Sequence, residues 1–149
     1  MNEIDFKNKQ IQIIVNLINT RRFDDALNKA KPLIKKFPKE YLFYNAAGMS
    51  LINLDRYDEA IKILEKAKEL NENNIFVLNN LGLAYFYLKN YQLSEQYYER
   101  ILKLKPDFLN ALINLSNLKK ELNLNEDALL ILEKALKYQI GRASCRERV

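Results

Sequence analysis

Histidine and tryptophan are absent from this 149-residue chain, and its single cysteine is Cys145. With no histidine, and no cysteine outside the last ten residues, zinc sites, Cys–His nucleophiles and histidine general bases are excluded. The three glycines include no two that lie close together, so there is no glycine-rich phosphate loop. We therefore expect the residues present to form no enzyme: no catalytic residue, no metal site and no cofactor site is predicted.

Glycine and proline are scarce, at three residues each, which disfavours folds built from many tight turns. Leucine, isoleucine, alanine, lysine, glutamate and asparagine dominate, and this composition favours helices. No apolar run approaches the ~18 residues that a membrane-spanning helix needs. The first residues also lack the basic start and apolar core of a signal peptide. The sequence therefore predicts a cytoplasmic, helical protein that does not bind membranes.

The formal net charge is +5, from 24 basic and 19 acidic residues. The last ten residues contribute +2, so the rest of the chain carries only +3. Both signs are interspersed along the sequence, as on solvated helix surfaces. This charge is too small and too mixed to indicate a nucleic-acid partner.

The chain does contain a clear internal period of 34 residues. Three series of residues share it, namely Ala26, Ala60, Ser94 and Ala128; Gly48, Gly82 and Ser116; and, two periods apart, Pro38 and Pro106. Three independent markers on one period predict a tandem repeat, whose units stack side by side.

Each repeat unit contains two amphipathic segments, such as residues 44–54 and 57–70 in the second unit. Apolar residues three and four positions apart share one face of a helix, so each segment has one stripe to bury. The short polar joint Asp55-Arg56 predicts an antiparallel helical hairpin. Small residues such as Gly48 would let the two helices of a unit approach closely.

The sequence at residues 75–108 resembles the tetratricopeptide repeat family. The matching residues are Leu78, Leu81, Gly82, Tyr85, Leu88, Tyr91, Ser94, Tyr98, Ile101, Leu104 and Pro106. The resemblance extends over four units, at residues 7–40, 41–74, 75–108 and 109–138, after an N-terminal extension of residues 1–6. It implies an all-α fold in which helix-turn-helix repeats stack as a right-handed α-solenoid.

The two outer units depart from the family pattern. The first unit has Gln10 and Ile14 where the pattern has a large apolar residue and a small one. The fourth unit has Lys119 and Asn125 at two core aromatic positions. Pro32 falls inside the second helix of the first unit, and we expect it to kink that helix.

The resemblance also implies a concave groove lined by the first helix of each unit. The predicted groove residues are Leu42, Asn45, Met49, Phe76, Asn79, Leu83, Phe86, Tyr87, Asn110, Ile113 and Asn117. Asparagine amides can hydrogen-bond an extended peptide backbone, while methionine and aromatic residues suit apolar contacts. The prediction is a scaffold that binds a protein or peptide partner with apolar side chains, either as an extended segment or as a helix.

Two alternatives to this groove remain open. Ile52 and Phe86 also fit a position between neighbouring helices, and another part of the same polypeptide could fill the groove. One subclass of the family binds acidic chaperone tails through a basic clamp, which would need lysine and then asparagine on the first inner helix. The corresponding pairs here are Ile11 and Val15, Asn45 and Met49, and Asn79 and Leu83. The clamp is missing, so that function is disfavoured.

The last ten residues, IGRASCRERV, differ in composition from the rest of the chain. Up to Gln139 there are seventeen lysines and four arginines, whereas the tail has three arginines and no lysine. One encoding of the tail reads as a common sequencing adapter, and the two adapter bases before it fit a Gln139 codon. We therefore interpret residues 139–149 as a non-native tail and expect no function for Cys145.

Without this tail the sequence would stop at Tyr138, inside the fourth unit. Repeat arrays normally end in a polar capping helix, but here Leu129, Leu132, Ala135 and Leu136 would stay partly uncovered. We therefore expect a fragment with a possible downstream domain in the same chain. Bacterial arrays resembling this one often precede a sulfotransferase or glycosyltransferase domain. The alternative function is thus the N-terminal docking module of a larger enzyme of that type.

Overall fold

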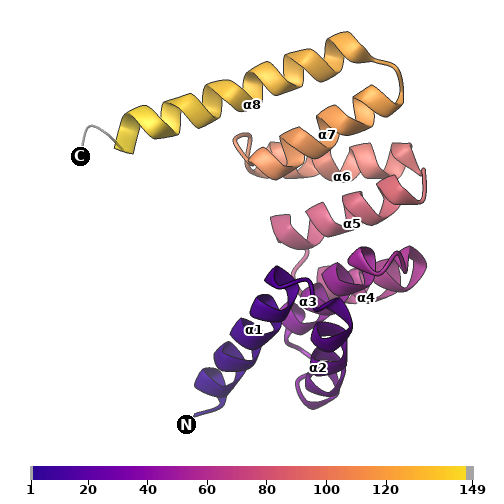
Figure 1. Cartoon of the computed structure of the whole chain (residues 1–149), viewed down its shortest axis with the longest axis vertical. Helices are drawn as coiled ribbons and strands as arrows, with labels where there is room; N and C mark the ends of the chain where they lie inside the picture. The colour runs from indigo at the N-terminus through magenta and orange to yellow at the C-terminus, as the bar shows by residue number, and fades with distance from the viewer. Residues whose placement is uncertain (1, 147–149) are drawn as a thin grey trace.

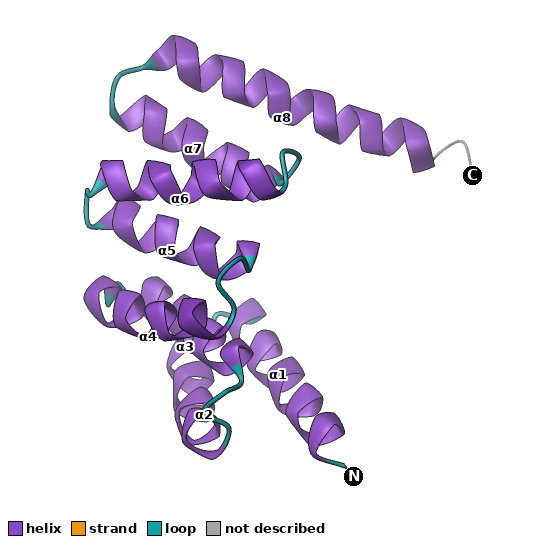
Figure 2. Cartoon of the chain, turned by 180° about the vertical axis from the view of Figure 1, so that it is seen from behind, coloured by secondary structure: helices purple, strands orange, loops and turns teal. Residues whose placement is uncertain are grey.

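The computed structural model describes residues 2–146, with side chains described as far as Gly141. Its described residues form eight α-helices and no strand. The helices are α1 (Glu3–Asn19), α2 (Phe23–Lys36), α3 (Tyr41–Asn53), α4 (Tyr57–Leu70), α5 (Ile75–Tyr87), α6 (Tyr91–Leu104), α7 (Leu109–Glu121) and α8 (Asn125–Arg146). They stack in chain order from α1 to α8 (Figures 1 and 2). The predicted α-solenoid of paired helices is therefore confirmed.

The odd-numbered helices form the inner row of this stack. Each helix packs against the next one in the chain, but the backbones of α1, α3, α5 and α7 also approach one another in series. Within the described part of the chain, the backbones of the even-numbered helices do not approach one another this closely. The first helices of the four units therefore lie closer together than the second helices, which bends the stack around the odd-numbered row.

The 34-residue period also appears in the backbone. The non-glycine residues with left-handed φ angles, between 57° and 60°, are Arg21, Asp55, Lys89 and Asn123. In the second unit the Asp55 N–H donates to the Ile52 carbonyl over 3.1 Å, and the Arg56 N–H donates to the Leu51 carbonyl over 2.9 Å. The same pair of bonds closes the turn inside each of the other three units. This is the Schellman motif, which ends a helix by reversing the chain.

Small residues bring the two helices of the middle units together, as predicted. A Cβ atom added at Gly48 would lie 2.4 Å from Cγ of Leu64, and one added at Gly82 would lie 2.7 Å from Cε1 of Tyr98. Both distances are shorter than carbon atoms tolerate. The large side chain of the second helix therefore occupies the space that the glycine leaves open.

In the first unit the large and small residues exchange places between the two helices. Ile14 stands at the position of Gly48, Ala30 stands at the position of Leu64, and both are fully buried. Gln10 is also buried. Helix α2 continues through Pro32 to Lys36. The first helix, α1, begins at Glu3 and so includes most of the segment that we expected to be an extension.

The fourth unit keeps the helix pair but changes its polar contacts. The Ser116 hydroxyl donates to the Ala128 carbonyl over 3.2 Å. In the third unit the equivalent bond runs the other way, from the Ser94 hydroxyl to the Gly82 carbonyl, over 2.7 Å. Lys119, at the aromatic position, is half-buried and pairs with a glutamate of α6.

Helix α8 is longer than the other second helices, with 22 residues against 14 in α2, α4 and α6. Its far half extends past the rest of the stack (Figures 1 and 2). The side chains of residues 142–149, including Cys145, lie outside the described part of the structure.

Candidate functional site

The predicted groove residues all lie on α3, α5 and α7, in the inner row of helices, and we call this set of eleven residues the inner face. Its exposed members are Met49, Phe76, Tyr87, Asn110, Ile113 and Asn117, and its half-buried members are Leu42, Asn45, Asn79, Leu83 and Phe86. None of the eleven is fully buried, whereas Ile52 is buried in the core. Of the two residues that also fitted a position between neighbouring helices, Ile52 is therefore buried, whereas Phe86 is half-buried.

Two asparagine pairs join neighbouring units along the inner face. The Nδ2 group of Asn80 donates to Oδ1 of Asn45 over 2.9 Å, and Nδ2 of Asn114 donates to Oδ1 of Asn79 over 3.1 Å. These bonds fix the orientation of the Asn45 and Asn79 amides. Among the described residues, no hydrogen bond engages the Nδ2 groups of these two asparagines. Each of the two middle units therefore carries one amide N–H donor group, on a half-buried asparagine, at the same position.

The aromatic part of the inner face is held by stacking between units. The rings of Tyr57 and Tyr87 lie 5.0 Å apart and nearly parallel, at 15°. Phe86 meets Tyr87 edge-on at 5.6 Å and also packs on Tyr91 at 5.7 Å. The Tyr57 hydroxyl donates to the Asp55 carboxylate over 2.5 Å, and this bond raises the pKa of Tyr57 to about 12. The Tyr87 ring is thus placed by a neighbour from the preceding unit.

The remaining exposed members are apolar or neutral. Phe76 meets Phe108 edge-on, with ring centroids 5.7 Å apart, and stays more than half exposed. Met49 and Ile113 are also exposed. No residue of the inner face carries a charge. The surface can therefore offer apolar contact and amide hydrogen bonds, but no ion pair of its own.

Sequence reasoning predicted the eleven residues of the inner face but not the residues that hold them. Asn80 and Asn114 orient the two groove asparagines, and Tyr57 positions Tyr87. Both asparagine pairs are 35 residues apart, one more than the repeat. A search for polar pairs at that offset would have found them.

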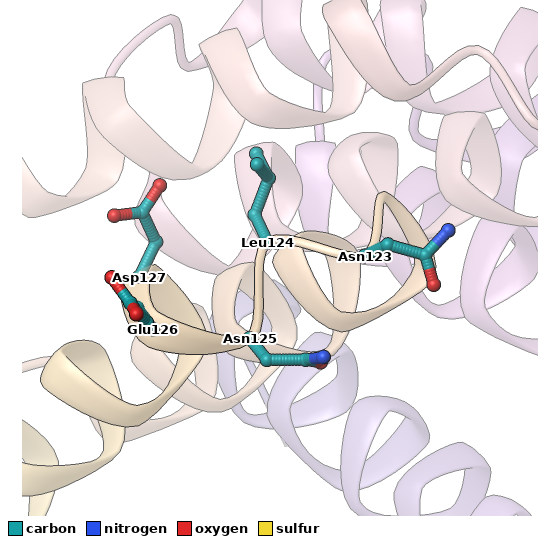
Figure 3. A pocket seen from close by; sticks show the side chains of 5 residues that line it. All are labelled: Asn123, Leu124, Asn125, Glu126 and Asp127. Atoms are coloured by element: carbon teal, nitrogen blue, oxygen red, sulfur yellow. The ribbon is translucent and has the colours of Figure 1, made fainter.

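Hollows elsewhere on the described surface offer weaker sites. A pocket of about 360 Å³ at the α7–α8 turn is lined by Asn123, Leu124, Asn125, Glu126 and Asp127. The side chains labelled in Figure 3 point in different directions, so their polar groups do not converge on one point.

The second hollow, of about 470 Å³, lies where α1 meets the α2–α3 turn. Its Lys7 ammonium group already pairs with Glu3 at 3.2 Å and with Glu40 at 3.6 Å. Neither hollow includes a residue of the inner face.

The described residues also hold no cluster of three or more acidic, histidine or cysteine side chains that could bind a metal ion. Within the same residues, no helix is both long and apolar enough to cross a membrane.

The fold defines the class of this protein as an α-solenoid of helical hairpins. Models of the tetratricopeptide repeat match residues 41–74 and 75–108. The two middle units are therefore tetratricopeptide repeats, and the eight described helices fit four tandem units of this kind. Tetratricopeptide repeats generally bind protein partners, and the two matched repeats support a protein-interaction scaffold role for this chain.

Several curated proteins share part of this sequence. Human sperm-associated antigen 1 is 28% identical over 109 residues, and the auxiliary subunit NAA15 of the N-terminal acetyltransferase A complex of Arabidopsis thaliana is 26% identical over 111 residues. These matches cover 73% and 74% of this chain but only 12% of each relative. A TPR repeat-containing protein of Halalkalibacterium halodurans is 36% identical over 56 residues, which cover 38% of this chain and 25% of that protein.

Solved structures agree on the fold. A thermophilic TPR protein of Thermus thermophilus superposes with a TM-score of 0.83 at 19% identity, over 93% of this chain and 77% of that one. A crystal structure of MamA gives 0.79 at 20% identity, over 92% of this chain and 80% of that one. The first TPR domain of human RPAP3 gives 0.72 at 19% identity, over 79% and 93%. At these identities the similarity concerns the fold alone.

Proposed function

We propose that this chain is a protein-interaction scaffold whose inner face binds an extended, apolar segment of a partner protein. The observation that carries the proposal is the repeated amide donor. Asn45 and Asn79 occupy the same position in successive units, and each has its oxygen engaged and its Nδ2 group unengaged among the described residues.

An extended peptide presents backbone carbonyl groups that oriented amide donors can bind. Each such neutral hydrogen bond contributes roughly 0.5–1.5 kcal/mol. Because the bonds from Asn80 and Asn114 already orient the two amides, less entropy is lost when a ligand binds them. The donors recognise the backbone of the ligand, so they would accept many side-chain sequences.

Side-chain preference would come from the exposed apolar members of the inner face. Phe76 and Tyr87 are aromatic side chains on α5, the helix that carries Asn79, and Met49 adds an adaptable apolar surface. Aromatic and methionine side chains are enriched at the centres of protein interfaces. Since the face has no charge, a strongly acidic or basic segment would lose hydration without gaining a counter-charge.

The test starts from a displayed library of random peptides selected on the whole chain. The affinity of a selected peptide is then measured by calorimetry for wild type and for Asn79→Asp. Aspartate keeps an oxygen that accepts the bond from Asn114 but has no N–H group to offer a ligand. We expect the affinity to fall about tenfold, which corresponds to ~1.4 kcal/mol.

The matched control is Asn28→Asp, the same chemical change at an exposed position of α2, outside the inner row. This variant should bind as wild type does. If the selected peptide binds Asn45→Asp, Asn79→Asp and Asn28→Asp with the affinity that it has for wild type, and circular dichroism shows all three variants folded, the inner face is not the binding site.

A further inference from the structure

The hollow of about 470 Å³ between the start of α1 and the α2–α3 turn has an aromatic floor, and we call it the lysine hollow. The Phe6 and Phe37 rings lie 6.0 Å apart at this floor, and Phe37 also packs on the buried ring of Phe43, again at 6.0 Å. The turn is held by α3, because the Tyr44 hydroxyl donates to the Pro38 carbonyl over 3.0 Å. These contacts fix the floor of the hollow in place.

The Lys36 ammonium group lies over this floor without a counter-charge. Its Nζ atom is 4.7 Å from the centre of the Phe6 ring and 5.3 Å from the centre of the Phe37 ring. The faces of aromatic rings attract a cation, so the two rings hold the ammonium group in position. Within the described part of the chain, no carboxylate pairs with Lys36 or with Lys39, which also lines the hollow. Two ammonium groups are therefore available to a ligand.

The charges that line the lysine hollow do not cancel. Lys7, Lys36 and Lys39 stand against two acidic side chains, Glu3 and Glu40, which leaves one positive charge. Both glutamates already pair with Lys7, at 3.2 Å and 3.6 Å. The second half of α2 adds to the excess, because it carries lysines and no acidic residue. One carboxylate group would compensate the remaining charge, whereas a polyanion would also be repelled by the two glutamates.

The lysine hollow does not lie on the side of α1 that a preceding helix would cover. That side carries Lys9, which stands at the position of Phe43 in α3, where the ring is buried against the preceding unit. Lys7 instead points to the α2–α3 turn and pairs there with Glu40. The hollow is thus open for a reason other than a missing neighbour in the stack.

The packing of a repeat unit does not require these side chains. One period later, Leu70 and Asn71 stand at the positions of Lys36 and Phe37. The second unit therefore folds without a lysine over an aromatic ring at this place. The combination in the first unit is free to serve a ligand.

We propose that the lysine hollow binds a segment of a partner protein in which an acidic and an aromatic side chain are adjacent. The carboxylate accepts hydrogen bonds from the Lys36 and Lys39 ammonium groups, and the aromatic ring packs on Phe37 and Pro38. Lys36, Pro38 and Lys39 are exposed, so the hollow covers only one side of its ligand. This suits a protein segment better than a small molecule, which a pocket usually encloses. The hollow would provide the ion pair that the inner face does not offer.

The probe is the peptide acetyl-Gly-Glu-Phe-Gly-amide, titrated into the isotope-labelled whole chain and followed through the amide NMR signals of the protein. We expect the signals of Phe37 and Lys39 to shift and to saturate with a dissociation constant of about a millimolar, because so short a ligand makes few contacts. A peptide with glutamine in place of glutamate should bind about fivefold more weakly. A peptide with alanine in place of phenylalanine should bind about threefold more weakly.

Lys36→Gln and Lys39→Gln each remove one ammonium group and should raise the dissociation constant about fivefold. The matched control is Lys35→Gln, the same change of charge at an exposed side chain of α2 that does not line the hollow. It should leave the constant unchanged. Circular dichroism shows whether each variant is folded. If Lys36→Gln loses helix content, Lys39→Gln still tests the proposal, because Lys39 lies in the turn between the helices.

The proposal is overturned if the probe causes no saturable shift, if the glutamate and glutamine peptides bind equally, or if Lys35→Gln weakens binding as much as the two hollow variants do. Shifts confined to α5 signals such as that of Asn79 would place the probe on the inner face and would also overturn it. Displacement of the probe by inorganic phosphate at a lower concentration than the probe's own would indicate a phosphate site instead of a carboxylate site.

Discussion

The first and second units bury the same two positions with opposite sizes. In the second unit a glycine, Gly48, faces a large Leu64, whereas in the first unit Ile14 and Ala30 occupy those positions. All four of these positions are buried. The comparison teaches that the repeat preserves the volume shared by its two helices rather than the residue at each position.

The junctions between units differ in the same way. The second and third units are joined by Asn45 and Asn80, and the third and fourth by Asn79 and Asn114. At the first junction the equivalent residues are Ile11 and Ala46, which pack in the apolar core. The two oriented amides of the inner face, Asn45 and Asn79, therefore belong to the two middle units.

The largest effect is expected from moving the first unit's isoleucine into the second unit. Gly48→Ile alone would drive the new side chain into Leu64, because even a Cβ atom would lie 2.4 Å from Cγ. We expect a loss of about 3 kcal/mol in the free energy of unfolding, the upper part of the range for overpacked cores. Urea denaturation followed by circular dichroism measures it.

The double variant Gly48→Ile with Leu64→Ala then reproduces the arrangement of the first unit. It should be more stable than the sum of the two single changes predicts, by roughly 2 kcal/mol. Additive effects would contradict the idea that the two positions share one volume.

The next prediction compares one packing position in two helices: in α4 the side chain at this position is buried, and in α8 it is partly exposed. Leu64→Ala removes a fully buried side chain, and we expect it to cost about 3 kcal/mol. Leu132→Ala removes the equivalent side chain of α8, which is 45% exposed, and should cost only about 1 kcal/mol. Equal losses in urea denaturation would contradict the partial exposure of Leu132.

Much of this architecture can be predicted from the sequence, because small residues recur with the 34-residue period at the positions where the two helices of a unit meet. Gly82 and Tyr98 are an example, since the close approach expected from the small residue is the contact that the structure contains. The expectation that Leu129, Leu132 and Leu136 are uncovered is confirmed, but Ala135 is buried, because it lies on the side of α8 that packs on α7.

The contacts between units were harder to predict. The sequence shows Asn45 and Asn79 as members of one series, but it does not show that Asn80 and Asn114 donate to them. The left-handed turn residues were also missed, because none of the four is a glycine. Such details depend on how two units sit against each other, and the pattern within one unit does not determine that geometry.

A smaller effect on stability is expected from removing the hydroxyl groups of two neighbouring tyrosines of α6. Tyr98 is fully buried, burial raises its pKa, and within the described structure its hydroxyl has no hydrogen-bond partner. Tyr97 lies one residue earlier, where its hydroxyl donates to Glu65 over 2.9 Å and accepts from Lys68 over 3.0 Å. Tyr98→Phe removes an unsatisfied polar atom and should stabilise the chain by about 1 kcal/mol.

Tyr97→Phe is the matched control and should have the opposite sign, because it removes two formed hydrogen bonds and costs about 1 kcal/mol. Thermal unfolding of the two variants beside wild type separates these outcomes. A loss of stability in Tyr98→Phe would show that its hydroxyl does find a partner in solution.

The smallest effect on stability is expected at the left-handed turn residues, and it tests whether the turns of different units are equally strained. Lys89 has φ of 60°, a left-handed conformation that costs a side chain with a Cβ atom roughly 1–2 kcal/mol. Glycine removes this strain but loses more chain entropy on folding, so Lys89→Gly should stabilise the protein by about 0.5 kcal/mol.

Asn123 has the same φ of 60°, but asparagine tolerates this conformation better than lysine does. Asn123→Gly should therefore change the unfolding free energy by no more than about 0.2 kcal/mol. Urea denaturation of both variants against wild type decides the matter. A larger gain at Asn123 than at Lys89 would mean that position in the array, rather than residue type, controls the strain in each turn.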